Sequence, residues 1–155
     1  MDDLLHVISG TNIEDVKSSD IDSCVDSLEK GKIIYLPSYC LTPNANEEPL
    51  LNDSFLKKRS KNVSYDYNQG LLSGVIKDYK LNVNLQQLMH RYAMFSKHLI
   101  DMILPIYSEN LIWGRTSFRP AEIKGRPSSK RKDDTRVHVD AFPSTPVNGH
   151  RILRV

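Results

Sequence analysis

Apolar residues recur at helical spacing near the start of the chain. Between residues 20 and 30 they follow the order i, i+3, i+4 and i+7, at Ile21, Cys24, Val25 and Leu28. This spacing predicts an amphipathic helix, which begins at a cap at residue 19 or 20 and ends before Gly31. Residues 32–36 then form a short apolar run that predicts a buried strand, stopped by a proline.

A second and longer apolar stripe follows Asn84, which is a suitable cap for a helix. Its members are Leu85, Leu88, Met89, Tyr92, Phe95, Leu99, Met102 and Ile103. The stripe predicts a helix that ends near Leu104, because Pro105 cannot continue it. We interpret this face as core that packs against a sheet.

The composition of residues 38–84 indicates a surface loop at 42–49, followed by irregular structure with short strands.

From residue 111 the apolar period changes to two, which is typical of strands. Residues 111–118, 135–140 and 151–155 are the predicted strands, with loops rich in Gly, Pro and Ser between them. The last strand would leave an apolar edge at the end of the sequence, and natural domains usually cover such an edge. The sequence therefore predicts either a pairing segment at the edge from Arg151 to Val155 or a longer protein.

Composition is that of one globular domain spanning residues 1–155. The 155 residues are 39% apolar and 26% charged, and no apolar run approaches the roughly 20 residues of a membrane span. The acidic N-terminus does not resemble a secretory signal. Cys24 and Cys40 lie far apart without a CxxC pattern, so they predict reduced thiols in a cytoplasmic protein.

Charge is unevenly distributed about the net value of +2, since the first 50 residues are acidic and residues 113–155 are basic. The basic run 130–132 is followed at once by two aspartates, which cancel much of its field. Together with the absence of a nucleic-acid-binding motif, this argues against a nucleic-acid partner.

The string TRVHVD at residues 135–140 carries the candidate chemistry. Side chains alternate along a strand, so Arg136, His138 and Asp140 would share one face. An imidazole and a carboxylate two residues apart, roughly 6.6 Å along a strand, can reach one metal ion. They form two-thirds of the facial triad of non-haem Fe(II) oxygenases. A bare His-x-Asp is also compatible with a surface hydrogen-bonded pair.

The other histidines are weaker metal ligands. His6 lies in a terminal segment that we expect to be mobile, and His90 and His98 lie among polar residues of the long predicted helix. His150 follows in a Gly/Asn turn, ten residues after Asp140. The sequence contains no glycine-rich phosphate loop, nucleophile elbow or CxxC pair that would support a rival chemistry.

Longer strings resemble the Kdo hydroxylase family. The most specific is DDTRVHVDAFP at residues 133–143, and weaker matches fall at residues 31–37 and 61–65. The other strong segments are 117–123, 125–126 and 151–155. These enzymes are Fe(II)- and 2-oxoglutarate-dependent dioxygenases that hydroxylate the 3-deoxy-octulosonic acid (Kdo) sugar of lipopolysaccharide. The resemblance implies that His138 and Asp140 are the first two iron ligands.

The resemblance also implies an α+β fold, in which N-terminal helices pack on the sheet of a double-stranded β-helix (a jelly roll). The 155 residues would supply about its first half. The distal histidine and the basic residue that binds 2-oxoglutarate would lie further along, so we expect no activity from this chain alone. Arg119, Arg126, Lys132 and Arg136 are candidates for binding the anionic sugar. For Arg136 the alternative is an ion pair with Asp133 or Asp134.

The implied partners are Fe(II), 2-oxoglutarate and a Kdo-containing glycolipid, with a peripheral contact to the inner membrane left open. Two alternatives remain beside the oxygenase. One is a non-catalytic remnant or binding module that uses the basic C-terminal surface. The other is a split enzyme completed by a second chain at the edge from Arg151 to Val155.

Overall fold

The computed structural model describes residues 4–10, 13–16, 18–52, 54–57, 60–77, 80–120 and 146–155. The chain forms two compact units, Met1–Pro120 and Ala121–Val155. Within the described ranges, all helices and strands belong to the first unit.

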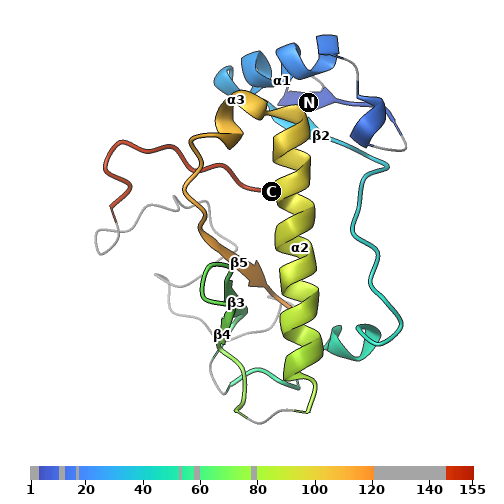
Figure 1. The fold of residues 1–155 in the computed structure, drawn as a ribbon, viewed down its shortest axis with the longest axis vertical. Coiled ribbons are helices and arrows are strands. Elements are labelled where there is room, and N and C mark those ends of the chain that lie inside the picture. Colours follow the sequence, from blue (N-terminus) through green and yellow to red (C-terminus); the bar gives the residue numbers. More distant parts are fainter. Residues whose placement is uncertain are drawn as a thin grey trace. The chain divides into compact units, whose positions relative to one another are not determined.

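A small parallel sheet and a helix open the first unit (Figure 1). Strand β1 (Leu5–Val7) is followed by a short 3-10 turn η2 (Ile13–Asp15), helix α1 (Ser18–Glu29) and strand β2 (Ile33–Tyr35). The strands pair in parallel, from Leu5↔Ile33 to Val7↔Tyr35. Gly31 follows the helix with φ +78, a left-handed conformation that glycine adopts without strain. The predicted helix, glycine turn and strand are therefore confirmed, but the strand was predicted to be buried and two of its three residues, Ile33 and Tyr35, are exposed.

The two faces of the β1–β2 sheet differ. His6 and Ile34 are half-buried, and the His6 ring contacts α1. On the other face the exposed fractions are 42% for Leu5, 53% for Val7, 62% for Ile33 and 50% for Tyr35. Parallel sheets usually have both faces covered, so an exposed apolar face on such a sheet is unusual.

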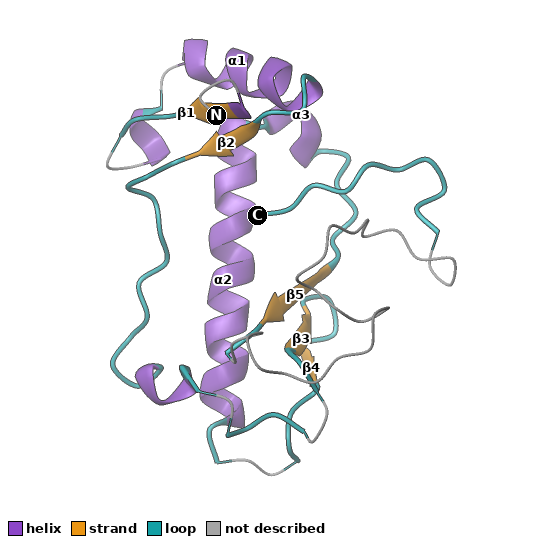
Figure 2. Ribbon diagram, turned by 180° about the vertical axis from the view of Figure 1, so that it is seen from behind, coloured by secondary structure: helices purple, strands orange, loops and turns teal. Residues whose placement is uncertain are grey.

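The second helix is the longest element. Helix α2 (Asn82–Ile103) is 22 residues long and is followed by the short helix α3 (Pro105–Ser108). Its end before Pro105 confirms the prediction. The predicted start of the helix at Asn84 is wrong, because the cap residue is Leu81. Asn84 lies inside the helix, where its side-chain amide donates to the Asn46 carbonyl. Helix α2 contacts α1 and also strands β3 and β5 (Figure 2).

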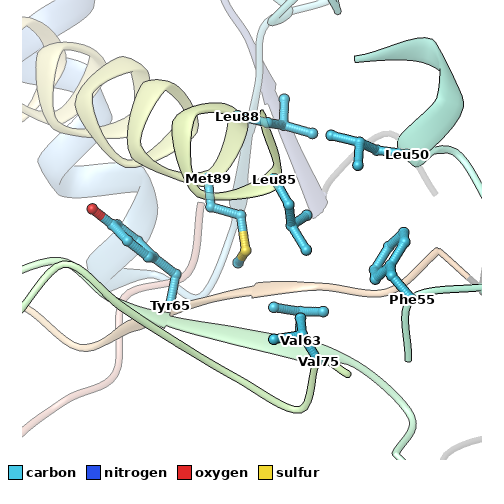
Figure 3. Packing of buried hydrophobic residues seen from close by; sticks show 8 residues of the cluster. All are labelled: Leu50, Phe55, Val63, Tyr65, Val75, Leu85, Leu88 and Met89. Carbon is cyan, nitrogen blue, oxygen red and sulfur yellow. The ribbon is translucent and has the colours of Figure 1, made fainter. Parts of the chain in front are cut away.

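Those strands belong to a three-stranded antiparallel sheet of order β4-β3-β5. It consists of β3 (Val63–Asp66), β4 (Leu71–Ser73) and β5 (Arg115–Phe118). The predicted strand at 111–118 is therefore confirmed only in its second half. A 3-10 turn, η3 (Glu48–Leu50), lies in the predicted loop. Figure 3 shows the core between α2 and this sheet, formed by Leu50, Phe55, Val63, Tyr65, Val75, Leu85, Leu88 and Met89.

The α+β class is thus confirmed, with α2 packed on a sheet as predicted. The sheets of the described residues are small and do not make a jelly roll.

In the second unit, residues 147–150 form a turn in which the backbone N–H of His150 donates to the Val147 carbonyl. Residues 151–155 are not a strand, so that prediction is wrong. The predicted strand at 135–140 lies outside the described residues.

Gly74 allows a close backbone approach in this sheet. Its φ is +88, and a Cβ built there would lie 2.5 Å from the Asn62 carbonyl oxygen. We expect Gly74→Ala to lower the free energy of unfolding by about 1–3 kcal/mol, measured by urea denaturation. Gly31→Ala is the matched control, because its φ is also positive but its Cβ would meet nothing within 4 Å. Equal losses in both variants would contradict a role for the Asn62 contact.

Candidate functional site

Most residues that the sequence nominates for chemistry lie in one segment. His138, Asp140, Arg136, Arg126 and Lys132 all fall within residues 121–145, outside the described residues. Their predicted arrangement on one strand face therefore stays a prediction. Arg119 is the one nominated sugar-binding residue within the described ranges, and it is exposed directly after the end of β5.

His6 corrects one expectation from the sequence. It is not in a mobile end but in β1, where it pairs with the middle of β2. Its Nδ1 lies 2.9 Å from the Ser27 hydroxyl and its Nε2 lies 3.2 Å from the Ser23 hydroxyl, both on α1. Both ring nitrogens are thus engaged in attaching the strand to the helix. The signal for this was absent from the local sequence, because the two serines follow 17 and 21 residues later.

His90 and His98, both on α2, also have structural contacts. His98 Nε2 lies 3.3 Å from Glu14 Oε1 on the surface of α2. His90 Nδ1 lies 3.1 Å from the Tyr65 hydroxyl, and its ring stacks on Tyr67 with centroids 5.4 Å apart. Among the described residues, no three His, Cys, Asp or Glu side chains come close enough together to hold a metal ion.

The cysteines are both free thiols, as predicted. Burial, together with the charge of Asp20, raises the pKa of Cys24 to about 11. This thiol therefore stays protonated near neutral pH, where a reactive cysteine would need to ionise.

Sequence reasoning missed an open surface pocket of about 510 Å³, which we call the amide pocket. It lies between the first half of α2, the loop before η3, and β3. Its lining residues are Asn44, Asn46, Glu47, Tyr65, Val83, Gln86, Gln87, His90 and Arg91. Four of these nine side chains are amides, and only Val83 is aliphatic. The residues come from three segments that are distant in the sequence, so no local motif predicts the pocket.

An ion pair between a buried glutamate and a half-buried arginine forms one wall of the amide pocket. Glu47 is only 3% exposed, and Arg91 Nη1 lies 2.5 Å from its carboxylate. The backbone N–H of Asn44 also donates to Glu47 Oε2, over 2.7 Å, while Arg91 Nη2 donates to the Thr42 carbonyl. Burial acts to raise the pKa of Glu47, but the hydrogen bonds from Arg91 and Asn44 and the charge of Arg91 outweigh it, so its pKa lies below 4.5. The pair therefore stays ionised and fixes the loop against α2.

Within the described part of the chain, no helix combines the length and apolar character that a membrane span requires.

Comparison with known proteins gives a consistent result over almost the whole chain. Residues 12–155 match the family model of 3-deoxy-D-manno-oct-2-ulosonic acid (Kdo) hydroxylase. No curated protein sequence matches the chain. Solved structures of the Kdo hydroxylase KdoO, a non-haem Fe(II) α-ketoglutarate-dependent dioxygenase, do match.

The KdoO complex with cobalt(II) matches with a TM-score of 0.85 and 34% identity, over 94% of this chain and 49% of that one. The apo structure gives 0.84 with the same identity and coverage. The complex with α-ketoglutarate and Fe(III) gives 0.83 and 34% identity, over 94% of this chain and 48% of that one. The chain thus spans about half the length of the solved structures that it matches.

Proposed function

The chain belongs to the Kdo hydroxylase family, and on that premise we propose that it is the N-terminal part of an Fe(II)- and 2-oxoglutarate-dependent oxygenase. The proposed reaction hydroxylates the Kdo sugar of a bacterial glycolipid. The observation that carries the proposal is the family match over residues 12–155, because it includes the His-x-Asp string.

His138 and Asp140 are the proposed iron ligands. One imidazole nitrogen and one carboxylate oxygen are the donor set that non-haem Fe(II) takes in a facial triad, whereas structural zinc favours thiolates. Bound iron would supply the activation of O₂, with 2-oxoglutarate as the co-substrate that is oxidised to succinate. We propose that the third ligand and the basic residue for 2-oxoglutarate lie outside these 155 residues, since the matched structures are about twice as long.

The proposed fold is a double-stranded β-helix, of which residues 1–155 form the N-terminal portion as one domain. Two observations support it: the TM-score of 0.85 to KdoO, and the exposed apolar face of the β1–β2 sheet, which further strands or loops would cover. The same face supports the second candidate, a split enzyme that a second chain completes.

Basic side chains are proposed to bind the anionic sugar. Arg136 would share the strand face of His138 and Asp140, and Arg119, Arg126 and Lys132 precede that segment in the sequence. A guanidinium can donate two parallel hydrogen bonds to the Kdo carboxylate, which suits recognition of this sugar. A lipid-linked acceptor would bring the protein to the cytoplasmic face of the inner membrane as a peripheral contact.

The test begins with sequencing of the coding DNA beyond codon 155. The protein encoded by the complete reading frame is then incubated with Fe(II), 2-oxoglutarate, O₂ and a Kdo-bearing lipid. We expect one oxygen atom to be added to the Kdo sugar and one succinate to form for each hydroxylation, and residues 1–155 alone to give neither. Turnover by the 155 residues alone would refute the proposed location of the missing ligands. A complete protein that oxidises 2-oxoglutarate without modifying Kdo would refute the substrate.

A further inference from the structure

The amide pocket has a lining that no step of the proposed hydroxylation uses. We propose that it binds an uncharged sugar through hydrogen bonds between its Asn and Gln side chains and the sugar hydroxyl groups. That this sugar is a neutral unit of the Kdo-bearing glycolipid rests on the proposed function, whereas the sugar binding itself does not.

Charge on the pocket wall excludes the simplest alternative, a site for an anion. Among the described residues of the lining, Arg91 is the only Lys or Arg, and its Nη1 lies 2.5 Å from the buried Glu47 carboxylate. Its Nη2 donates to the Thr42 carbonyl over 3.1 Å. The cation and the carboxylate neutralise each other, so the wall offers little net charge to attract either an anion or a cation.

Amide side chains provide what a polyol requires. Each amide carries a carbonyl that accepts and an NH₂ that donates, and each sugar hydroxyl both donates and accepts. Asn44 and Asn46 come from the loop, while Gln86 and Gln87 come from α2, so amides face the cavity from two elements. The volume of about 510 Å³ lies within the roughly 300–1,000 Å³ typical of small-molecule sites.

Part of the pocket wall is also held in place before any ligand arrives. Gln86 Nε2 donates to the Gly70 carbonyl over 2.7 Å, and the His90 ring is held between the Tyr65 hydroxyl and the face of Tyr67. Trp113 also packs against Tyr67, with centroids 5.3 Å apart. Side chains that are already ordered lose little entropy on binding, which favours a weak polar ligand such as a sugar.

The test measures binding of methyl α-glucopyranoside to residues 1–155 by saturation-transfer NMR, without iron or 2-oxoglutarate. We expect a Kd of about 1–10 mM, because a single small sugar makes few contacts. Gln87→Leu and Asn46→Ala should each weaken binding about 3–10-fold through lost hydrogen bonds. Gln69→Leu is the matched control, because Gln69 is an exposed glutamine outside the pocket lining, and it should leave the Kd unchanged.

The possible results distinguish binding of a neutral sugar at the amide pocket from its alternatives. Binding that the two pocket variants weaken and Gln69→Leu does not supports the proposal. No binding at about 50 mM, or equal effects in all three variants, overturns it. Tighter binding of free Kdo or glucuronate than of the neutral sugar also overturns it, because an anion would then be the ligand.

The assignment to the glycolipid has its own test. Tighter binding of the delipidated glycan of the Kdo lipid than of the glucoside assigns the site to the glycolipid, and equal binding refutes that assignment. Since the assay contains no iron, failure of hydroxylation does not affect it.

Discussion

Replacement of His138 or Asp140 by alanine is expected to weaken metal binding by more than about 100-fold in the protein encoded by the complete reading frame. The magnitude follows because loss of a residue that merely supports a ligand already costs about 10–100-fold in affinity. Titration with Co(II), the ion present in one KdoO structure, would measure the Kd without turnover. Hydroxylation of Kdo should be lost in parallel.

His98→Ala is the matched control for these variants. His98 is a half-exposed histidine of α2 whose contact is the Glu14 carboxylate, and the proposal gives it no part in the site. Its replacement should change neither the Co(II) affinity nor hydroxylation. Unchanged metal affinity in His138→Ala would remove that residue from the proposed ligand set, whatever the effect on activity.

Arg91→Met is expected to lower the free energy of unfolding by about 2–4 kcal/mol. The variant leaves the Glu47 carboxylate, which is 3% exposed, without its cationic partner. Breaking a fully buried pair costs roughly 3–5 kcal/mol, and we expect somewhat less here because Arg91 is 33% exposed. Denaturation in urea measures the loss. The double variant Glu47→Gln/Arg91→Met should be more stable than Arg91→Met alone, since no unpaired charge remains; a double variant of equal or lower stability would contradict this explanation.

The same pair makes stability depend on pH in a defined direction. The pKa of Glu47 is lower in the folded protein than its ordinary value of 4.5. Its stabilising contribution is therefore complete above pH 4.5 and is lost as the pH falls from there through the folded pKa. Glu47→Gln should remove this part of the acid-induced loss of stability while leaving the rest of the profile unchanged.

Local sequence patterns predicted the elements that depend on local spacing. Helices α1 and α2 have long apolar stripes, and Gly31 and Pro105 mark their ends, so both were predicted closely. Strand β1 was missed because it has three residues and pairs with a strand more than 25 residues later. Asn84 was predicted as a helix cap since it is a good capping residue, but its side chain bonds to the distant Asn46 carbonyl instead.

The two candidate sites also differ in whether the local sequence reveals them. The Kdo hydroxylase string at residues 133–143 is contiguous, so the sequence alone led to the family. The amide pocket is not contiguous. Glu47 lies in a segment rich in Pro, Asn and Glu, which is typical of a solvated loop, and its burial depends on Arg91, 44 residues later. Gln86 and Gln87 are solvent-exposed residues of α2, and only the folded structure places the loop beside them.

The parallel pairing of β1 with β2 has a consequence during synthesis on the ribosome. Strand β1 is made before its partner β2, and it stays unpaired until the 28 residues from His6 to Ile33 have been added. At typical elongation rates of about 5–20 residues per second this takes roughly 1–6 s. During that interval Leu5 and Val7 are apolar residues of an unpaired strand, a state that is prone to aggregation. The unpaired strand β1 would therefore benefit from a chaperone until β2 has been made.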